Sequence, residues 1–198
     1  GSLYLWINPL WTLRVRGRNK IRDRVPSVLV SNHQSFLDIL VLYALYRQFK
    51  FVSKKEVFSL PVIGWLMVLN QYIPLRRGST ESIQRMMKEV RENAARGSSI
   101  MMFPEGTRNK RADQLLPFKE GAFVMAQQNK LPVIPVVLYG TGRTIPKGRL
   151  LIQRRQKIVM QVLDPLSYDR IKDMKARDLA DWVRSQMQET LDKIRSDG

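Results

Sequence analysis

Hydrophobic residues recur along the chain at two spacings, one typical of strands and one typical of helices. Short β-branched or apolar runs, which predict strands, occupy residues 27–31, 49–53, 71–75, 99–103, 133–139 and 157–163. Apolar residues three or four positions apart, which predict helices, occupy residues 36–47, 79–96, 120–129 and 175–195. This alternation, without an internal repeat or linker, predicts a single-domain α/β layered fold. Its central sheet is expected to be mostly parallel (mixed) and flanked by helices.

Two of the predicted helices have clear apolar faces and end signals. In residues 79–96 the face consists of Ile83, Met86, Met87, Val90 and Ala94. Ser79 is a suitable N-cap for this helix, and Gly97 stands at its C-terminal end. In residues 175–195 the apolar stripe consists of Leu179, Trp182, Val183, Met187, Leu191 and Ile194. We expect both stripes to pack against the sheet.

Two apolar, aromatic segments are candidates for contact with a membrane. Neither residues 3–13 nor residues 57–75 form an unbroken apolar stretch of the roughly 20 residues that span a bilayer. Tryptophan favours the membrane–water boundary, so Trp6, Trp11 and Trp65 are the expected membrane-contacting residues. For residues 57–75 a buried core helix is the equal alternative.

A basic run follows the first of these segments. Six cations alternate with other residues in positions 14–24: Arg14, Arg16, Arg18, Lys20, Arg22 and Arg24. Such a run suits an anionic membrane surface, and the alternative is a solvated edge strand or loop. We therefore expect a membrane-associating N-terminal segment in residues 1–24 and the main domain in residues 25–198. Gly1-Ser2 is typical of a cloning scar, so we expect a truncated N-terminus.

Composition narrows the chemistry. The 198 residues include 34 Lys and Arg against 17 Asp and Glu, a net charge of +17, which indicates an anionic partner. The chain has no cysteine, which excludes thiol catalysis, disulfides and thiolate metal sites. We expect no bound metal. The chain also has a single histidine, which makes His33 the best candidate for a general base.

His33 stands in a polar stretch between a predicted strand and a predicted helix. The stretch reads Asn32-His33-Gln34-Ser35-Phe36-Leu37-Asp38. Ser35 suits the N-cap of the helix, and Asp38 falls three residues later, where a capping box has its acidic residue. Across the bend, the Asp38 carboxylate can also reach the His33 ring and fix its tautomer. The alternative is that Asp38 only caps the helix.

A second polar stretch follows the predicted strand 99–103. It reads Phe103-Pro104-Glu105-Gly106-Thr107-Arg108. Ligands bind at the carboxyl ends of strands in open α/β sheets, so this stretch is a second candidate for the site. Thr107 can donate a hydrogen bond, and Arg108 can bind an oxyanion with two. Ordinary turn chemistry is the alternative.

The two stretches together resemble the signatures of the glycerolipid acyltransferases, in particular the lysophosphatidate acyltransferase group. Three further stretches resemble blocks of that family: residues 72–77, 133–136 and 118–121. The resemblance covers roughly residues 25–148 and implies a glycerol-3-phosphate acyltransferase-like fold. It also implies transfer of an acyl chain from acyl-CoA or acyl carrier protein to the sn-2 hydroxyl of lysophosphatidate, which gives phosphatidate.

By this resemblance, His33 is the general base and Asp38 orients it. Glu105, Gly106, Thr107 and Arg108 match the acceptor-binding motif, and Arg77 matches the arginine of the block between the signatures, with Arg76 as its alternative. We expect Glu105 to orient an arginine or contact the glycerol hydroxyl, and N–H groups near Gly106 are candidate oxyanion donors. Asn32, Ser35 and Lys119 are expected supporting residues.

The expected partners are a lysophospholipid acceptor, acyl-CoA or acyl carrier protein, and an anionic membrane surface. No cofactor beyond the thioester co-substrate and no nucleic acid are expected. We expect association with the cytoplasmic face of the cell membrane. Alternative acceptors are glycerol 3-phosphate, another lysolipid or a lyso-aminolipid. Alternatives of another class are a nucleic-acid-binding protein, a phospholipid-binding module without catalysis and a phosphoryl-transfer enzyme.

Overall fold

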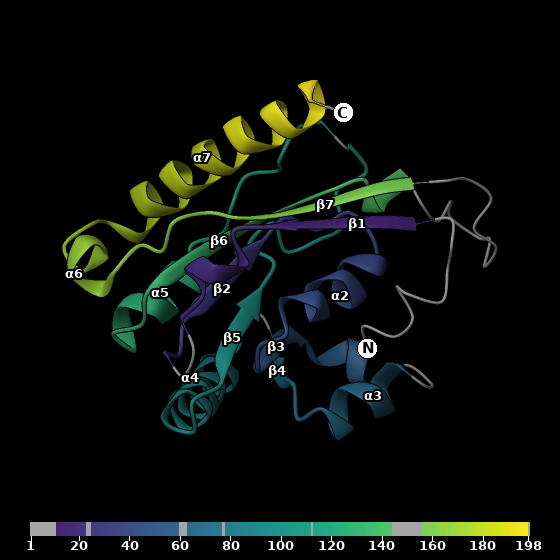
Figure 1. Ribbon diagram of the computed structural model, residues 1–198. Helices are drawn as coiled ribbons and strands as arrows, with labels where there is room; N and C mark the ends of the chain where they lie inside the picture. Colours follow the sequence, from purple (N-terminus) through teal and green to yellow (C-terminus); the bar gives the residue numbers. More distant parts are fainter. Residues whose placement is uncertain are drawn as a thin grey trace.

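The protein folds around one seven-stranded mixed sheet with helices on both faces (Figure 1). The structure is a computed structural model that describes residues 11–22, 25–59, 63–76, 78–111, 113–143 and 156–197. The strands are β1 (Trp11–Arg16), β2 (Val28–Ser31), β3 (Phe49–Lys54), β4 (Ile73–Leu75), β5 (Ser99–Met102), β6 (Val133–Tyr139) and β7 (Gln156–Val162). The α-helices are α2 (Leu37–Leu42), α3 (Ile63–Leu69), α4 (Thr80–Ala95), α5 (Gly121–Gln128), α6 (Tyr168–Ile171) and α7 (Ala176–Ser196). Short 3₁₀ helices are η1 (Arg18–Lys20), η2 (Tyr43–Leu45), η3 (Lys55–Ser59) and η4 (Thr141–Arg143).

The strand order is β1-β7-β6-β2-β5-β3-β4, which places β2 in the middle. β2 pairs in parallel with both β5 and β6, and β3 pairs in parallel with β5 and β4. β7 runs antiparallel to β6 and parallel to β1. The prediction of a mostly parallel mixed sheet is therefore confirmed. The sheet strands end within a residue or two of the predicted runs, apart from β1, which the sequence analysis kept only as an alternative.

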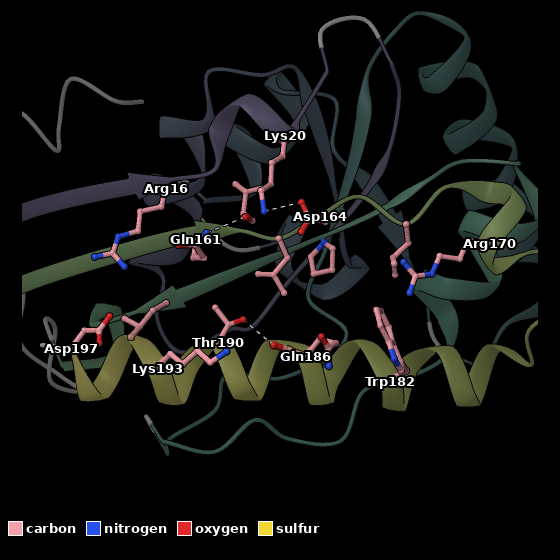
Figure 2. A pocket seen from close by; sticks show the side chains of 15 residues that line it. Arg16, Lys20, Gln161, Asp164, Arg170, Trp182, Gln186, Thr190, Lys193 and Asp197 are labelled. Atoms are coloured by element: carbon pink, nitrogen blue, oxygen red, sulfur yellow. Dashed lines mark hydrogen bonds and ion pairs between the residues drawn. The ribbon is translucent and has the colours of Figure 1, made fainter.

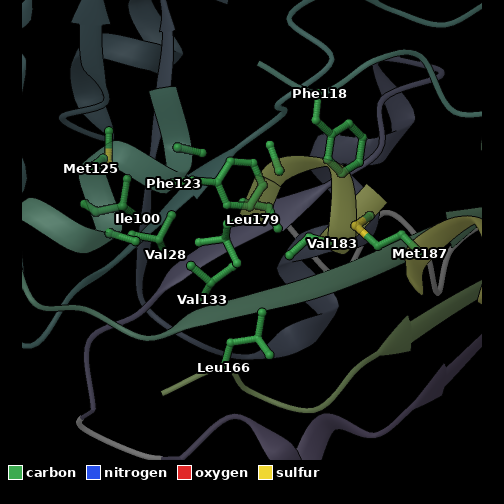
Figure 3. Packing of buried hydrophobic residues seen from close by; sticks show 14 of the residues in the cluster. Val28, Ile100, Phe118, Phe123, Met125, Val133, Leu166, Leu179, Val183 and Met187 are labelled. Atoms are coloured by element: carbon green, nitrogen blue, oxygen red, sulfur yellow. The ribbon is translucent and has the colours of Figure 1, made fainter. Parts of the chain in front are cut away.

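Two apolar clusters cover the two faces of the sheet. One contains the buried sides of α4, α5 and α7, where Phe123, Leu179 and Val183 pack on Val28 and Val133 (Figure 3). The other contains α2 and η2, packed on Leu29 and Ile134 among others. Because side chains alternate across a strand, neighbouring residues of β2 and β6 feed both clusters. The central strands are consequently buried on both faces, as is usual for parallel strands.

The predicted helices exist, with local corrections. Ser79 caps α4 by accepting a hydrogen bond from the Ser82 N–H at 3.2 Å, but Ile83 is exposed rather than buried. The α7 stripe is buried except at Trp182, which is 37% exposed. The helix predicted at 36–47 ends as α2 at Leu42 and tightens into η2, a common ending for a helix.

The first described segment is part of the sheet. β1 is an edge strand, with Leu13 and Val15 facing the core and Arg14 and Arg16 exposed. This agrees with the edge-strand alternative for the start of the basic run. Residues 11–16, on the N-terminal side of the predicted boundary after residue 24, join the main sheet by pairing with β7. The predicted membrane contact at Trp6 lies outside the described residues, and so does the side chain of Trp11.

The apolar segment 57–75 does not form a buried helix. Its helix, α3, covers only Ile63–Leu69, and Trp65 is 72% and Leu69 78% exposed. Met67 of this helix turns into the core. Within the described residues, no helix has both the length and the apolar character needed to cross a bilayer. The outcome is a short helix with an exposed apolar face.

Candidate active site

The two polar stretches meet at the carboxyl ends of two neighbouring strands of the sheet. They follow β2 and β5, which are parallel neighbours with Val30 opposite Met102. The carboxyl ends of both strands therefore lie on the same side of the sheet, and the stretches after them lie side by side. His33 and Glu105, one from each stretch, are joined by a hydrogen bond.

His33 and Asp38 form the pair that the sequence predicts. The His33 Nδ1 lies 2.8 Å from Asp38 Oδ2. Asp38 is fully buried, whereas the His33 side chain is 16% exposed. An ionised carboxylate only accepts hydrogen bonds, so in the neutral ring Nδ1 carries the proton and Nε2 carries the lone pair. The pair can thus present an unprotonated Nε2 to a substrate.

Asp38 also organises the start of α2. The same oxygen, Oδ2, accepts the main-chain N–H groups of Gln34 at 2.7 Å and Ser35 at 2.8 Å. Ser35 Oγ in turn accepts the N–H of Leu37 at 3.2 Å. This is the reciprocal pattern of a capping box, although the helix begins two residues after Ser35. Capping and orientation of His33 are therefore two roles of one carboxylate.

The His33 ring stacks on Phe103. The ring centroids lie 4.0 Å apart with an interplanar angle of 14°. Phe103 itself stacks on Phe51 from β3, at 5.7 Å. The imidazole is thus held between a carboxylate at its edge and an aromatic ring at its face. The sequence analysis gave Phe103 no role, although it begins the second motif.

Glu105 holds the main chain of His33. Its Oε1 accepts the His33 N–H at 2.9 Å, and its Oε2 accepts the Leu116 N–H at 3.0 Å. Burial raises the pKa of Glu105, and the main-chain hydrogen bonds from His33 and Leu116 act in the opposite direction. Among the described residues, these two hydrogen bonds come from main-chain N–H groups and not from an arginine, so they show Glu105 holding the main chain.

Two asparagines fix the His33 loop from either side. Asn32, which was predicted as a supporting residue, donates to the Leu138 carbonyl and accepts from the Leu138 N–H, both at 2.8 Å, and so ties the loop to β6. Asn109 donates its main-chain N–H to the His33 carbonyl at 2.7 Å. Asn109 was missed by the sequence analysis, since it lies just beyond the quoted motif and its contact is long-range.

The remaining motif residues surround the pair less closely. The Gly106 N–H donates to the Phe103 carbonyl at 3.0 Å in a turn where Gly106 has φ 70°, so this N–H is not a ready oxyanion donor. Thr107 and Arg108 are exposed, and the Arg108 guanidinium lies 4.2 Å from the centre of the Phe36 ring. Lys119 is exposed, and its N–H donates to the Pro104 carbonyl at 2.9 Å.

The block between the two signatures, residues 72–77, is described only in part. Arg76 is exposed, and its N–H donates to Ser82 Oγ at 2.8 Å, which places it at the start of α4. Arg77 lies outside the described residues. Among those that are described, no three His, Cys, Asp or Glu side chains gather as a metal site would require.

Comparison with known proteins supports this assembly of motifs. The family model described as Acyltransferase matches residues 12–139. A 1-acyl-sn-glycerol-3-phosphate acyltransferase of Brassica napus, named as chloroplastic, is 37% identical over 95% of this chain and 53% of its own length. One of Saccharomyces cerevisiae is 34% identical over 92% of this chain and 60% of its own length. This chain thus spans about half the length of the curated relatives it matches.

A solved structure has the same fold. The crystal structure of the 1-acyl-sn-glycerophosphate (LPA) acyltransferase PlsC from Thermotoga maritima matches with a TM-score of 0.78 and 24% identity. The match covers 98% of this chain and 75% of the other. At this identity the likeness establishes the fold.

Proposed function

The chain belongs to the acyltransferase family, and from that premise we propose that it transfers an acyl group to the sn-2 hydroxyl of lysophosphatidate, which yields phosphatidate. The donor is a thioester of coenzyme A or of acyl carrier protein. The names of the Brassica and yeast relatives support this acceptor. No cofactor takes part in this scheme.

In this mechanism His33 Nε2 removes the proton of the acceptor hydroxyl as its oxygen attacks the thioester carbonyl carbon. A new C–O bond forms, and the carbonyl becomes a tetrahedral oxyanion. Collapse of that intermediate breaks the C–S bond, and the departing thiolate takes the proton from the His33 imidazolium. A positioned base of this kind contributes about 10²- to 10⁴-fold to the rate.

The observation that carries the proposal is the 2.8 Å contact between His33 Nδ1 and Asp38 Oδ2. A carboxylate at Nδ1 favours the tautomer with a free Nε2 and stabilises the imidazolium that forms during attack. The His33 main chain is bonded on both sides, to Glu105 and Asn109, so the ring is held in place before substrate binds. Preorganisation of this kind lowers the cost of reaching the transition state.

For the acceptor phosphate we propose Arg108 together with an arginine of the block at residues 72–77, Arg77 or Arg76. Arg108 follows Glu105 by three residues and is exposed beside Phe36, near the start of α2. An arginine binds phosphate oxygens with two parallel hydrogen bonds, which lysine cannot do. Thr107 is exposed in the same turn and can donate a further hydrogen bond.

We further propose that the enzyme works at an anionic membrane surface, with α3 inserted at the head-group level. The support is the exposed apolar face that includes Trp65 and Leu69, combined with a net charge of +17. Apolar side chains and nearby cations together give interfacial binding. The cytoplasmic face of the cell membrane is the placement we propose for testing by fractionation.

The test is one incubation of the purified protein in liposomes with labelled acyl-CoA or acyl carrier protein thioesters. The acceptors are lysophosphatidate, glycerol 3-phosphate, lysophosphatidylcholine and a lyso-aminolipid, and products are read by mass spectrometry. We expect phosphatidate as the main product. Preferential acylation of another acceptor would overturn the choice of lysophosphatidate, and no acylation at all would overturn the enzymatic proposal.

A further inference from the structure

A groove separates α7 from the paired strands β1 and β7 (Figure 2). Its volume is about 540 Å³, which lies within the range of roughly 300–1,000 Å³ typical of small-ligand sites. We propose that this groove binds a phosphate monoester that carries an apolar group. The proposal does not rest on the acyltransferase reaction.

The groove is separate from the His33 site. Pro135, near the start of β6, lines the groove, whereas the His33 loop is tied to Leu138 near the end of that strand. The groove also lies beneath α7, and α2, which begins beside His33, packs on the other face of the sheet. An acyl donor bound at His33 would not fill it.

Part of the lining of the groove is apolar. Val162 and Leu166, which are buried, and Leu163 line it from β7 and the segment after it, and Ile194 lines it from α7. Trp182, the one exposed residue of the α7 stripe, also faces the groove (Figure 2). An apolar group of a ligand would gain from leaving water here, by about 25 cal/mol for each Å² of apolar surface removed.

Two cations provide the charge for a phosphate. Arg16 lines the groove from β1 and Lys193 from α7 (Figure 2). Within the described parts of the chain, neither has an ion-pair partner. A phosphate monoester carries a charge of about −1.5 to −2 at neutral pH, which two cations balance. A ligand with a single carboxylate, which carries one negative charge, would leave one of these two cations without an opposite charge.

Most of the other charged side chains of the lining contact a neighbouring side chain of the groove. Lys20 Nζ pairs with Asp164 Oδ1 at 2.8 Å, and the Arg170 guanidinium lies 5.2 Å from the centre of the Trp182 ring. Asp197 remains as a carboxylate at the end of α7. The lining thus has four cations, Arg16, Lys20, Arg170 and Lys193, against two carboxylates, Asp164 and Asp197.

Gly17 lies in the chain between Arg16 and Lys20, two residues that line the groove. It has φ 72°, and a Cβ at this position would lie 2.5 Å from the Val162 carbonyl oxygen. A side chain is therefore excluded where β1 turns into η1. The turn is closed by the Lys20 N–H, which donates to the Gly17 carbonyl at 3.0 Å, and it brings Lys20 to Asp164.

The size of the groove favours a small ligand over a peptide. An α-helix is about 10–12 Å wide with its side chains, so this volume would hold only about one turn. One turn offers too few contacts for specific recognition. A phosphate ester with a short alkyl chain satisfies both the cations and the apolar lining.

The test is a fluorescence titration of the full chain with hexyl phosphate, because Trp182 lines the groove and reports directly on it. The same titration in the Trp182→Phe variant identifies the Trp182 signal among the four tryptophans. We expect saturable binding, at least about tenfold tighter than that of inorganic phosphate or of hexanol, since each has only half of the recognised chemistry. Isothermal titration calorimetry gives a second measurement that does not depend on Trp182.

The variant Arg16→Gln/Lys193→Gln should weaken hexyl phosphate binding about tenfold by removing two partly exposed charge contacts. The matched control, Lys88→Gln/Arg91→Gln, removes the same charge from the exposed face of α4 and should bind as the unaltered protein does. His33→Ala should also bind hexyl phosphate normally, which separates this site from the proposed active site.

Three results would overturn the proposal. One is binding that both double variants weaken equally, which would indicate attraction by net charge alone. Another is inorganic phosphate that binds as tightly as hexyl phosphate, which would show that the apolar lining takes no part. The third is binding of hexaglutamate without binding of hexyl phosphate, which would assign the groove to an acidic peptide.

Discussion

The main-chain N–H of His33 donates to the side chain of Glu105 at 2.9 Å, so the polar stretch after β5 holds the polar stretch after β2 through a buried carboxylate. The other oxygen of Glu105 is bonded to Leu116, at 3.0 Å. In the proposed reaction Glu105 is therefore expected to be a positioning residue, acting through the His33 main chain.

We predict that Glu105→Gln lowers kcat while leaving the KM for the acceptor nearly unchanged. Glutamine has one carbonyl oxygen and one NH₂ group in place of the two carboxylate oxygens. Its NH₂ group must therefore face one of the two main-chain N–H groups from which Glu105 accepts a hydrogen bond. The loss of one charge-assisted buried hydrogen bond corresponds to a fall in kcat of roughly 10- to 100-fold. Steady-state kinetics in liposomes would test this, with Glu120→Gln, an exposed residue at the start of α5, as the matched control. A large rise in KM with normal kcat would instead make Glu105 an acceptor-binding residue.

The pH dependence of stability provides a second prediction for Glu105. Burial raises its pKa above the ordinary value of 4.5 in the folded protein. The folded chain therefore holds this proton more tightly than the unfolded chain does. The resulting stability is present at acid pH and is lost as the pH rises from about 4.5 through the raised folded pKa.

Urea unfolding of the unaltered protein and of Glu105→Gln across this pH window measures the effect. The free energy of unfolding of the unaltered protein, relative to the variant, should fall as the pH rises. A relative increase would mean that the hydrogen bonds from His33 and Leu116 outweigh burial and that the folded pKa is lowered.

We predict that His33→Ala reduces kcat by about 10²- to 10⁴-fold, the contribution of a positioned general base. The His33 side chain is partly exposed, and its main-chain bonds to Glu105 and Asn109 do not need the imidazole. Thermal unfolding and vesicle binding should therefore stay close to those of the unaltered protein. Turnover that survives in the variant would remove His33 from the mechanism.

Sequence reasoning located the site because its two halves follow neighbouring parallel strands. The stretches that begin at Asn32 and Phe103 each come directly after a buried strand, and strand ends of this kind share an edge. Sequence reasoning missed the contacts that depend on how distant parts of the chain are oriented in the folded structure. The stack of Phe103 on His33 and the bond from Asn109 to the His33 carbonyl have no signature in residue spacing.

Apolar periodicity likewise predicted which residues form helices better than it predicted which faces of those helices are buried. Trp182 shares the spacing of the α7 stripe, yet it lines the groove beside Arg170 and stays partly exposed. In α3, Trp65, Leu66, Val68 and Leu69 are exposed, an outcome that composition alone cannot distinguish from a buried helix. The sequence did not distinguish the edge strand β1 from a membrane-contacting run, because arginines at its exposed positions suit both an edge strand and a membrane surface.

We predict that Trp65→Ser/Leu69→Ser weakens binding to anionic vesicles by about tenfold or more. Both side chains are more than two-thirds exposed, so their loss should leave the fold intact while removing the apolar surface that would enter the membrane. Vesicle sedimentation measures the affinity, and a water-soluble short-chain acceptor measures the chemistry separately. Ile83→Ser, on the exposed side of α4, is the control and should bind vesicles normally. Equal binding by both variants would exclude α3 as the membrane contact.

Ionic strength should separate the electrostatic part of membrane docking from the apolar part. With a net charge of +17, the chain is attracted to an anionic surface over distances that salt controls. The screening length falls from about 10 Å at 0.1 M salt to about 3 Å at 1 M, so activity on anionic liposomes should fall steeply across this range. Activity on a water-soluble acceptor should change much less, because the contact of His33 with the buried Asp38 is shielded from solvent. A flat response on liposomes would mean that α3 and the apolar contacts alone hold the protein at the membrane.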